Sequence, residues 1–284
     1  MAAVAEKRRM CPNCRAFITT DDKVCPYCDL KLGPKAIEMR NPSALLGGLV
    51  PAARFTTVII LTINIGLYIA TMLYSMRGGN EAALTDLDGQ TLLFFGAKFS
   101  PFVWAGQYWR LITAGFLHGG LLHIFMNTWV LYDLGAHAEE TYGTSRMVVI
   151  YLASTVTGFL ASSLWYPGLS VGASAGIFGL IGAMIAVGVR SRSSTAQAIK
   201  GMYTRWAVYG LLFGLLPGLH IDNAAHLGGM AGGFVVAWIA REPGLLPFSG
   251  KERLWNWTAG ICLALTALAF TEMFFSMQSL SRMS

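Results

Sequence analysis

Charged residues are scarce in this chain. Asp, Glu, Lys and Arg together make up 13% of the 284 residues, whereas a soluble domain usually carries about 25%. Hydrophobic residues make up 54%, and the mean hydropathy is +0.52. This composition excludes an ordinary soluble domain and indicates a membrane protein.

The first forty residues lack a long apolar run, so we expect no cleavable signal peptide. Further along, apolar windows approach the roughly 20 residues needed to cross the hydrocarbon core. They lie at about 56–76, 118–137, 146–165, 171–189, 203–219, 223–240 and 254–275. The sequence therefore predicts an all-α, multi-pass protein embedded in the lipid bilayer.

Lys and Arg are absent from two short connections, residues 166–170 and 220–222. Basic residues gather instead before the first window and after the fourth and sixth windows. Because positive residues accumulate on the cytoplasmic side, we expect a cytoplasmic N-terminus and an outer C-terminus, in the plasma or inner membrane. This topology also explains the formal charge of +6, so nucleic acid is not an expected partner.

Cysteine is rare, and four of the five cysteines form two CxxC pairs, CPNC at 11–14 and CPYC at 25–28. Cys11, Cys14, Cys25 and Cys28 could surround a structural Zn²⁺ ion tetrahedrally. A disulfide is less favoured in a reducing compartment. The short spacing between the pairs leaves iron or a redox role as an alternative. The segments FITT and DDKV between the pairs predict a small hairpin.

These features divide the chain into four parts. We expect a cytoplasmic zinc-ribbon-like head at 1–33, a linker rich in proline and glycine at 34–55, and a membrane core at 56–240. A cytoplasmic loop, a seventh transmembrane helix and an outer tail would occupy 241–284, where Cys262 is expected to be packing bulk. The head could bind an unknown cytoplasmic partner.

Hydrogen-bonding side chains inside three windows point to chemistry, because polar groups at membrane depth are costly. His123 and Asn127, four residues apart, share a face of the second window. Ser174 and His226 each lie a few residues inside an outer connection, so their depths match. Each group alone would be an ordinary helix contact, but their coincidence at one depth favours a catalytic site.

Small residues at four-residue spacing allow the windows that carry Ser174 and His226 to approach closely. Gly172 and Gly176, then Gly179 and Ala183, show this spacing in the fourth window, and Gly229 and Gly233 show it in the sixth.

The residues resemble the rhomboid intramembrane serine proteases over roughly 56–240. The resemblance lies in YWRLITAGFLH at 108–118, HGGLLHIFMN at 118–127, LGAHAE at 134–139, GASAGIFG at 172–179 and AHLGGMAGG at 225–233. It implies a six-helix core with a serine and histidine dyad at the floor of a water-filled cavity open to the outer side. The seventh helix would lie outside this core.

Site roles follow from the resemblance position by position. Ser174 would be the nucleophile and His226 the general base and later acid, while the Ser174 N–H and the side chains of His123 and Asn127 would form the oxyanion hole. The supporting residues would be Phe178 against the imidazole, His118 near the cavity mouth, Trp109, Arg110 and Glu139 in the fold, and Gly172 and Gly229 at the close helix contact. Ala175 departs from the family pattern, in which glycine often follows the serine.

The predicted activity is an intramembrane serine endopeptidase that cuts transmembrane helices of other proteins near the outer side through an acyl-enzyme. No acidic residue is clearly placed as a third triad member, and Asp222 fits a helix start better. Catalysis would need no cofactor. The alternatives are a catalytically silent rhomboid-like protein that binds membrane clients, and a channel or transporter.

Overall fold

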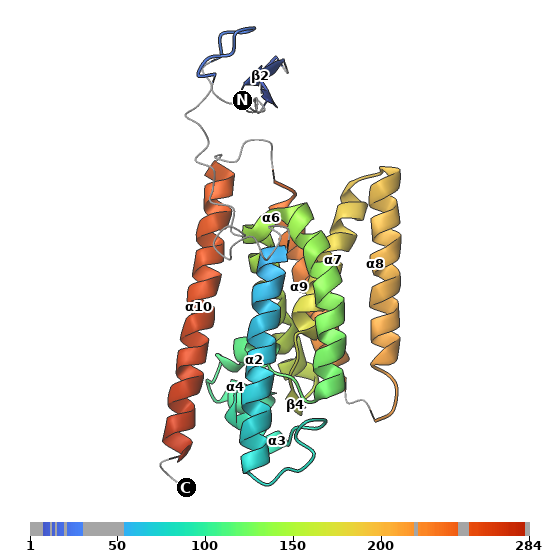
Figure 1. The fold of residues 1–284 in the computed structure, drawn as a ribbon. Coiled ribbons are helices and arrows are strands. Elements are labelled where there is room, and N and C mark those ends of the chain that lie inside the picture. Colours follow the sequence, from blue (N-terminus) through green and yellow to red (C-terminus); the bar gives the residue numbers. More distant parts are fainter. Residues whose placement is uncertain are drawn as a thin grey trace, which may run out of the picture. The chain divides into compact units, whose positions relative to one another are not determined.

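The computed structural model describes residues 8–11, 13–14, 16–19, 22–30, 54–218, 221–243 and 250–281 (Figure 1). The chain divides into two compact units, Met1–Ala52 and Ala53–Ser284. The expected linker at 34–55 lies outside the described residues except for its last two positions.

The first unit holds a small antiparallel sheet. Strand β1, Arg8–Met10, pairs with β2, Phe17–Thr19, so that Met10 lies opposite Phe17. The turn between these strands contains the first CxxC pair, and the N–H of Cys11 donates to the carbonyl of Ala16 at 2.8 Å. The hairpin of β1 and β2 therefore encloses the first pair of cysteines. The sequence had instead predicted a hairpin of FITT and DDKV, between the two cysteine pairs.

The second unit is a bundle of long helices (Figure 1). Its long helices are α2, Phe55–Arg77; α6, Leu121–Trp165; α7, Ser174–Arg190; α8, Ser194–Phe213; α9, Asn223–Ala240; and α10, Gly250–Ser281. Three of them, α2, α6 and α10, are long and apolar enough to cross a membrane, and α7 is a shorter apolar helix. α6 covers most of the second predicted window and all of the third, and Gly143 interrupts the helix between them with φ 75°.

The long connection, residues 78–120, is the part of the fold that the apolar windows did not predict. It forms α3, Gly89–Phe94; β3, Lys98–Phe99; α4, Ser100–Trp104; α5, Arg110–Thr113; and the 3₁₀ turn η2, Ala114–Phe116. Strand β3 pairs with β4, Leu169–Ser170, which comes shortly before α7. The long connection is thereby tied to the chain leading into Ser174.

Arg110 holds the long connection together from inside. It is 2% exposed, and its guanidinium donates to the carbonyls of Leu93 and Ala97 at 2.8 and 2.9 Å. Its Nε also donates to the Gln107 side chain at 2.6 Å. One buried cation therefore bonds two backbone carbonyls of the long connection.

The helix α7 lies at the centre of the bundle and packs against α6, α8 and α9. Glycine makes this possible on the α9 side. A Cβ added to Gly233 would lie 2.0 Å from the carbonyl oxygen of Gly179, and one added to Gly182 would lie 2.2 Å from that of Met230. The two backbones therefore touch directly, as the spacing of small residues predicts.

Candidate active site

The predicted nucleophile, Ser174, is the first residue of α7 and is half-buried. The chain enters α7 through Gly172, whose N–H donates to the carbonyl of Ala114 at 2.9 Å. Gly172 has φ 132°, a region that L side chains rarely adopt. A Cβ there would also lie 2.7 Å from Nε2 of His123. Both backbone conformation and space therefore require glycine two residues before the serine.

His226 lies in the first turn of α9 and is 6% exposed. Its imidazole stacks on the ring of Phe178, with centroids 4.1 Å apart and planes 8° from parallel (α7 and α9 in Figure 1). Phe178 follows Ser174 by one helical turn, so the two share a face of α7. The histidine therefore lies against the face of α7 that carries the serine.

The backbones of α7 and α9 meet beside these two residues. A Cβ on Gly229 would lie 2.2 Å from the carbonyl oxygen of Ala175. The helix α6 joins this contact through Gly158, where a Cβ would lie 2.7 Å from the carbonyl oxygen of Ala225 and 2.8 Å from the Ala175 Cβ. Three helices thus converge next to Ser174 and His226, and Gly158 is a member of the contact that sequence reasoning missed.

Asp222 is the N-cap of α9, as its position predicts. Its Oδ1 accepts the N–H of Ala225 at 3.0 Å, and its Oδ2 accepts the hydroxyl of Ser162. Within the described residues, Nδ1 of His226 has no hydrogen-bond partner. The Asp222 carboxylate is therefore occupied by the start of α9 and by Ser162.

The side chains of His123 and Asn127 reach the same place from α6. A Cβ on Gly172 would lie 2.7 Å from Nε2 of His123 and 3.5 Å from Nδ2 of Asn127. Nδ1 of His123 accepts a long hydrogen bond of 3.4 Å from the N–H of Gly119. Nε2 then carries the proton of the neutral ring, so a donor points toward the entrance of α7. Nδ2 of Asn127 is buried without a partner among the described residues.

His118 is 1% exposed and lies against His123, with ring centroids 5.1 Å apart. Neither of its ring nitrogens has a partner in the described part of the chain. The sequence placed this histidine near a cavity mouth, and the structure places it deep beside the predicted oxyanion donors.

Lys98 is a further residue at this end of the bundle that sequence reasoning missed. It is fully buried, and its Nζ donates to the carbonyl of Tyr166 and, at 3.2 Å, to that of Gly168. It thereby fixes the turn that leads to Gly172. A lone lysine within the apolar run LLFFGAKF was the available signal.

Known proteins match the part of the chain that carries the candidate site. Residues 105–243 match the family model for the Rhomboid domain. Rhomboid-like protease 2 of Toxoplasma gondii is 30% identical over 193 residues, which cover 67% of each chain. The chain belongs to the rhomboid family. This rhomboid is accordingly an integral, multi-pass membrane protein.

Other relatives share a smaller part of their length with this rhomboid. Rhomboid protease GluP of Bacillus subtilis is 38% identical over 148 residues, which are 52% of this chain and 29% of that protein. RHOMBOID-like protein 1 of Arabidopsis thaliana is 36% identical over 170 residues, 58% of this chain and 43% of that protein. Every site residue described from His118 to His226 lies within the matched domain, whereas the N-terminal unit and α10 lie outside it.

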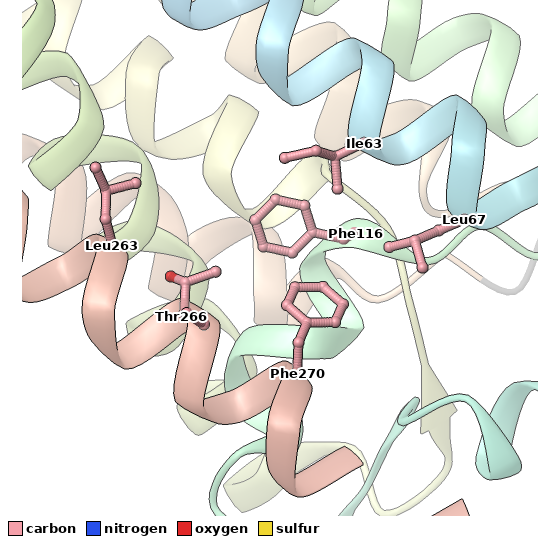
Figure 2. Close-up of a pocket in the computed structure, with 7 residues that line it drawn as sticks. Ile63, Leu67, Phe116, Leu263, Thr266 and Phe270 are labelled. Carbon is pink, nitrogen blue, oxygen red and sulfur yellow. The ribbon is translucent and has the colours of Figure 1, made fainter. Parts of the chain in front are cut away.

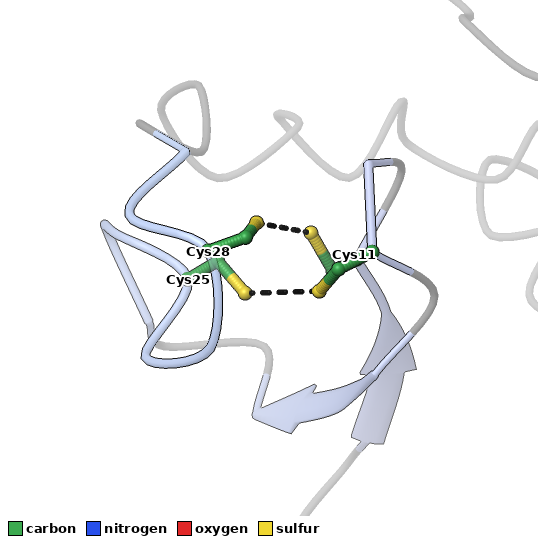
Figure 3. A group of neighbouring side chains, drawn as sticks. Cys11, Cys25 and Cys28 are labelled. Atoms are coloured by element: carbon green, nitrogen blue, oxygen red, sulfur yellow. Dashed lines mark hydrogen bonds between the residues drawn. The ribbon is translucent and has the colours of Figure 1, made fainter.

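The four paired cysteines of the rhomboid's N-terminal unit come together in space (Figure 3). Their sulfur atoms all lie within 4.8 Å of one another, with 3.6 Å between Cys11 and Cys28 and between Cys14 and Cys25. Tetrahedral Zn–S bonds of about 2.3 Å place sulfur atoms about 3.8 Å apart. These cysteines can therefore hold a metal ion. A backbone hydrogen bond at Leu30 lowers the pKa of Cys28 to about 6, whereas burial raises the pKa of Cys25.

Proposed function

We propose that this rhomboid is an intramembrane serine endopeptidase that cleaves transmembrane segments of other proteins. The observation that carries the proposal is the stacking of His226 on Phe178, one helical turn from Ser174. This contact supports a serine and an imidazole facing one another at the start of α7. The relatives named as rhomboid proteases support the same activity.

In the proposed reaction, Ser174 attacks the carbonyl carbon of a substrate peptide bond while His226 accepts the hydroxyl proton. The C–N bond then breaks, and His226 returns this proton to the leaving amine, which leaves an acyl-enzyme on Ser174. His226 then deprotonates a water molecule, which attacks the ester carbonyl carbon. The bond to Ser174 Oγ breaks, His226 returns the proton to Oγ, and the carboxylate product leaves. Nδ1 of His226 has no hydrogen-bond partner among the described residues, which supports a two-residue mechanism without a carboxylate.

The tetrahedral intermediate needs hydrogen-bond donors for its oxyanion. We assign this role to the backbone N–H of Ser174, which as the first residue of α7 has no partner within the helix, and to Nε2 of His123 and Nδ2 of Asn127. The position of Gly172 against both side chains supports this assignment. The stacked Phe178 would keep the imidazole in place, and Gly229 would allow α9 to approach α7 closely.

The substrate is proposed to be a transmembrane helix that unwinds near its outer end, because hydrogen bonds within a helix shield its peptide bonds. Glycine or proline in the substrate would favour unwinding. The proposed orientation places the N-terminus in the cytoplasm and the start of α7 toward the outer side. Basic residues at the opposite end of the core, Arg190 and Arg241, support it.

Reaction with a serine-directed fluorophosphonate tests the activity most directly. The wild-type chain should be labelled, and Ser174→Ala and His226→Ala should lose the label. Wild type should also cleave some members of a panel of single-pass helices in liposomes, and Ser174→Ala should cleave none. A folded wild type that neither reacts nor cleaves would favour a silent client-binding protein, and ion or solute flux without labelling would favour a channel or transporter.

For the N-terminal unit we propose a structural zinc ion held by Cys11, Cys14, Cys25 and Cys28, with iron as the alternative. Four thiolates complete the coordination of zinc and leave no open position. The metal would therefore stabilise the head and take no part in peptide hydrolysis. Because the head would take no part in hydrolysis, we also propose that it binds a cytoplasmic partner.

A further inference from the structure

The helix α10 packs against the core through one narrow face. Its buried and half-buried residues recur every three or four positions, at Ala259, Cys262, Thr266, Phe270, Met273 and Met277. Large apolar side chains are exposed elsewhere on α10, including Leu268 at 60% on the opposite face and Phe274 at 53% beside the packed face. This pattern is that of a helix with one face on protein and one face on lipid. α10 lies outside the matched rhomboid domain, so the family comparison assigns it no role.

The protein-facing side of α10 reaches the long connection. Figure 2 shows Ile63 and Leu67 of α2 facing Leu263, Thr266 and Phe270 of α10 across an apolar pocket of about 350 Å³, with Phe116 beside them. The rings of Phe270 and Phe116 meet edge to face, with centroids 5.5 Å apart. Phe116 is 3% exposed and also contacts Tyr151 of α6 edge to face. Phe116 is thus packed between Tyr151 of α6 and Phe270 of α10.

A second contact joins α10 to the same part of the long connection. Gly96 has φ 93°, and a Cβ there would lie 3.3 Å from Cγ of Met273. The carbonyl of Gly96 accepts the Thr113 hydroxyl at 2.7 Å. Met273 is 7% exposed. It therefore packs beside Gly96, at the point where the hydrogen bond to Thr113 fixes the chain to the end of α5.

The segment Ala114–His118 connects these contacts to the candidate active site. The Ala114 carbonyl accepts the Gly172 N–H at 2.9 Å, two residues before Ser174. At its other end, His118 packs on His123. Between them, Phe116 carries the aromatic contact with α10. One short segment therefore contacts α10 on one side and both the serine turn and a proposed oxyanion donor on the other.

We propose that α10 is a positioning element of the active site, and that Phe270 acts through Phe116 on the segment that holds Gly172. The inference rests on the proposed protease function for its catalytic consequence. Phe270 is a positioning residue, since it touches no proposed reacting group. Small displacements of a catalytic group lower reaction rates strongly. A change in the packing at Phe116 would therefore shift Ser174 and lower the rate.

The test compares Phe270→Ala with Phe274→Ala in the full chain reconstituted in liposomes. Both substitutions remove a phenyl ring from α10, but only Phe270 contacts Phe116. We expect Phe270→Ala to lower kcat and the rate of fluorophosphonate labelling by roughly tenfold to a hundredfold, with KM unchanged, and Phe274→Ala to behave as wild type. Phe270→Leu should recover most of the rate, because leucine refills much of the space.

Hydrogen exchange gives a readout that does not depend on activity. In Phe270→Ala the Gly172 amide should exchange faster than in wild type or Phe274→Ala, because its hydrogen bond to Ala114 loosens. If wild type itself takes no label while this exchange still rises, the proposed function fails and the packing connection stands. The inference is overturned if Phe270→Ala keeps wild-type kcat and exchange, or if both alanine variants lose activity equally with the same fall in unfolding midpoint.

Discussion

Gly172 combines two requirements that act on a single position. Its φ of 132° excludes an unstrained side chain, and His123 occupies the space that a Cβ would need. His123 and Asn127 can approach the entrance of α7 only because nothing projects from this residue. The surroundings of Ser174 thus depend on Gly172, a residue that has no reactive group.

Gly172→Ala should therefore abolish most of the activity while leaving the bundle folded. We expect kcat to fall by on the order of a hundredfold, the effect of losing one oxyanion donor, because the added methyl displaces Nε2 of His123. Cleavage and fluorophosphonate labelling in liposomes measure this change.

Gly66→Ala is the matched control, since a Cβ at Gly66 of α2 has nothing within 4 Å. It should keep wild-type activity and unfold at an equal or slightly higher temperature, because alanine favours a helix over glycine. Equal activity of Gly172→Ala and Gly66→Ala would contradict the assigned oxyanion site.

At the scale of elements, the helices differ in how their ends are fixed. Arg146, near the start of the second half of α6, pairs with Glu252 in the first turn of α10 through two bonds of 2.7 Å. The side chains are 5% and 15% exposed. Arg190 at the end of α7 pairs with Glu242 at 2.8 Å, but the Glu242 side chain is 42% exposed. The first pair anchors α10 to the core, and the second is a surface pair.

These two pairs predict unequal losses of stability. Glu252→Gln leaves the buried Arg146 charge poorly compensated and should lower the free energy of unfolding by roughly 1–3 kcal/mol. A fully buried pair would lose about 3–5 kcal/mol, and partial exposure of Glu252 reduces this. Glu242→Gln should lower it by less than about 1 kcal/mol. Denaturation of both variants in the same detergent checks the order, and a larger loss in Glu242→Gln would contradict it.

The apolar windows predicted the long helices well because crossing a membrane leaves a simple signal, a run of apolar residues of fixed length. Even the division of α6 into two windows agrees with the break at Gly143. The long connection left no such signal. Its elements are short, and its strand β3 pairs with β4 about seventy residues away, with Lys98 opposite Ser170. Pairing over that distance depends on the packed bundle and cannot be inferred from local pattern.

The candidate site was predictable to a similar extent. Matching depths of Ser174 and His226 followed from counting residues inward from two short connections. Their supporting contacts did not, because Gly158, Ser162 and Lys98 act through positions that only the folded chain brings near α7. The sequence could name groups able to react, whereas their surroundings required the structure.

At the scale of the whole molecule, the chain joins a small cysteine-bound unit to a membrane core. The two units have separate sources of stability: a four-cysteine cluster in the first, and close helix packing in the second. Loss of the proposed metal ion should therefore affect the first unit and leave the second unit intact.

The purified full chain should contain about one zinc ion per molecule by elemental analysis. Cys11→Ser with Cys14→Ser should abolish metal binding, while fluorophosphonate labelling in detergent remains. Cys262→Ser, which removes the remaining cysteine from α10, should keep the metal. Iron in place of zinc would overturn the zinc assignment, and lost labelling in the double variant would overturn the independence of the two units.

The imidazole of His226 stacks on a phenyl ring, and its Nδ1 has no hydrogen-bond partner in the described part of the chain. Stacking of this kind is insensitive to ionic strength but depends on how tightly neighbouring spans are pressed together. Under the proposed function, the surrounding lipid would therefore influence the rate of catalysis. Bilayers that differ in thickness or lateral pressure should change turnover more than changes in salt do.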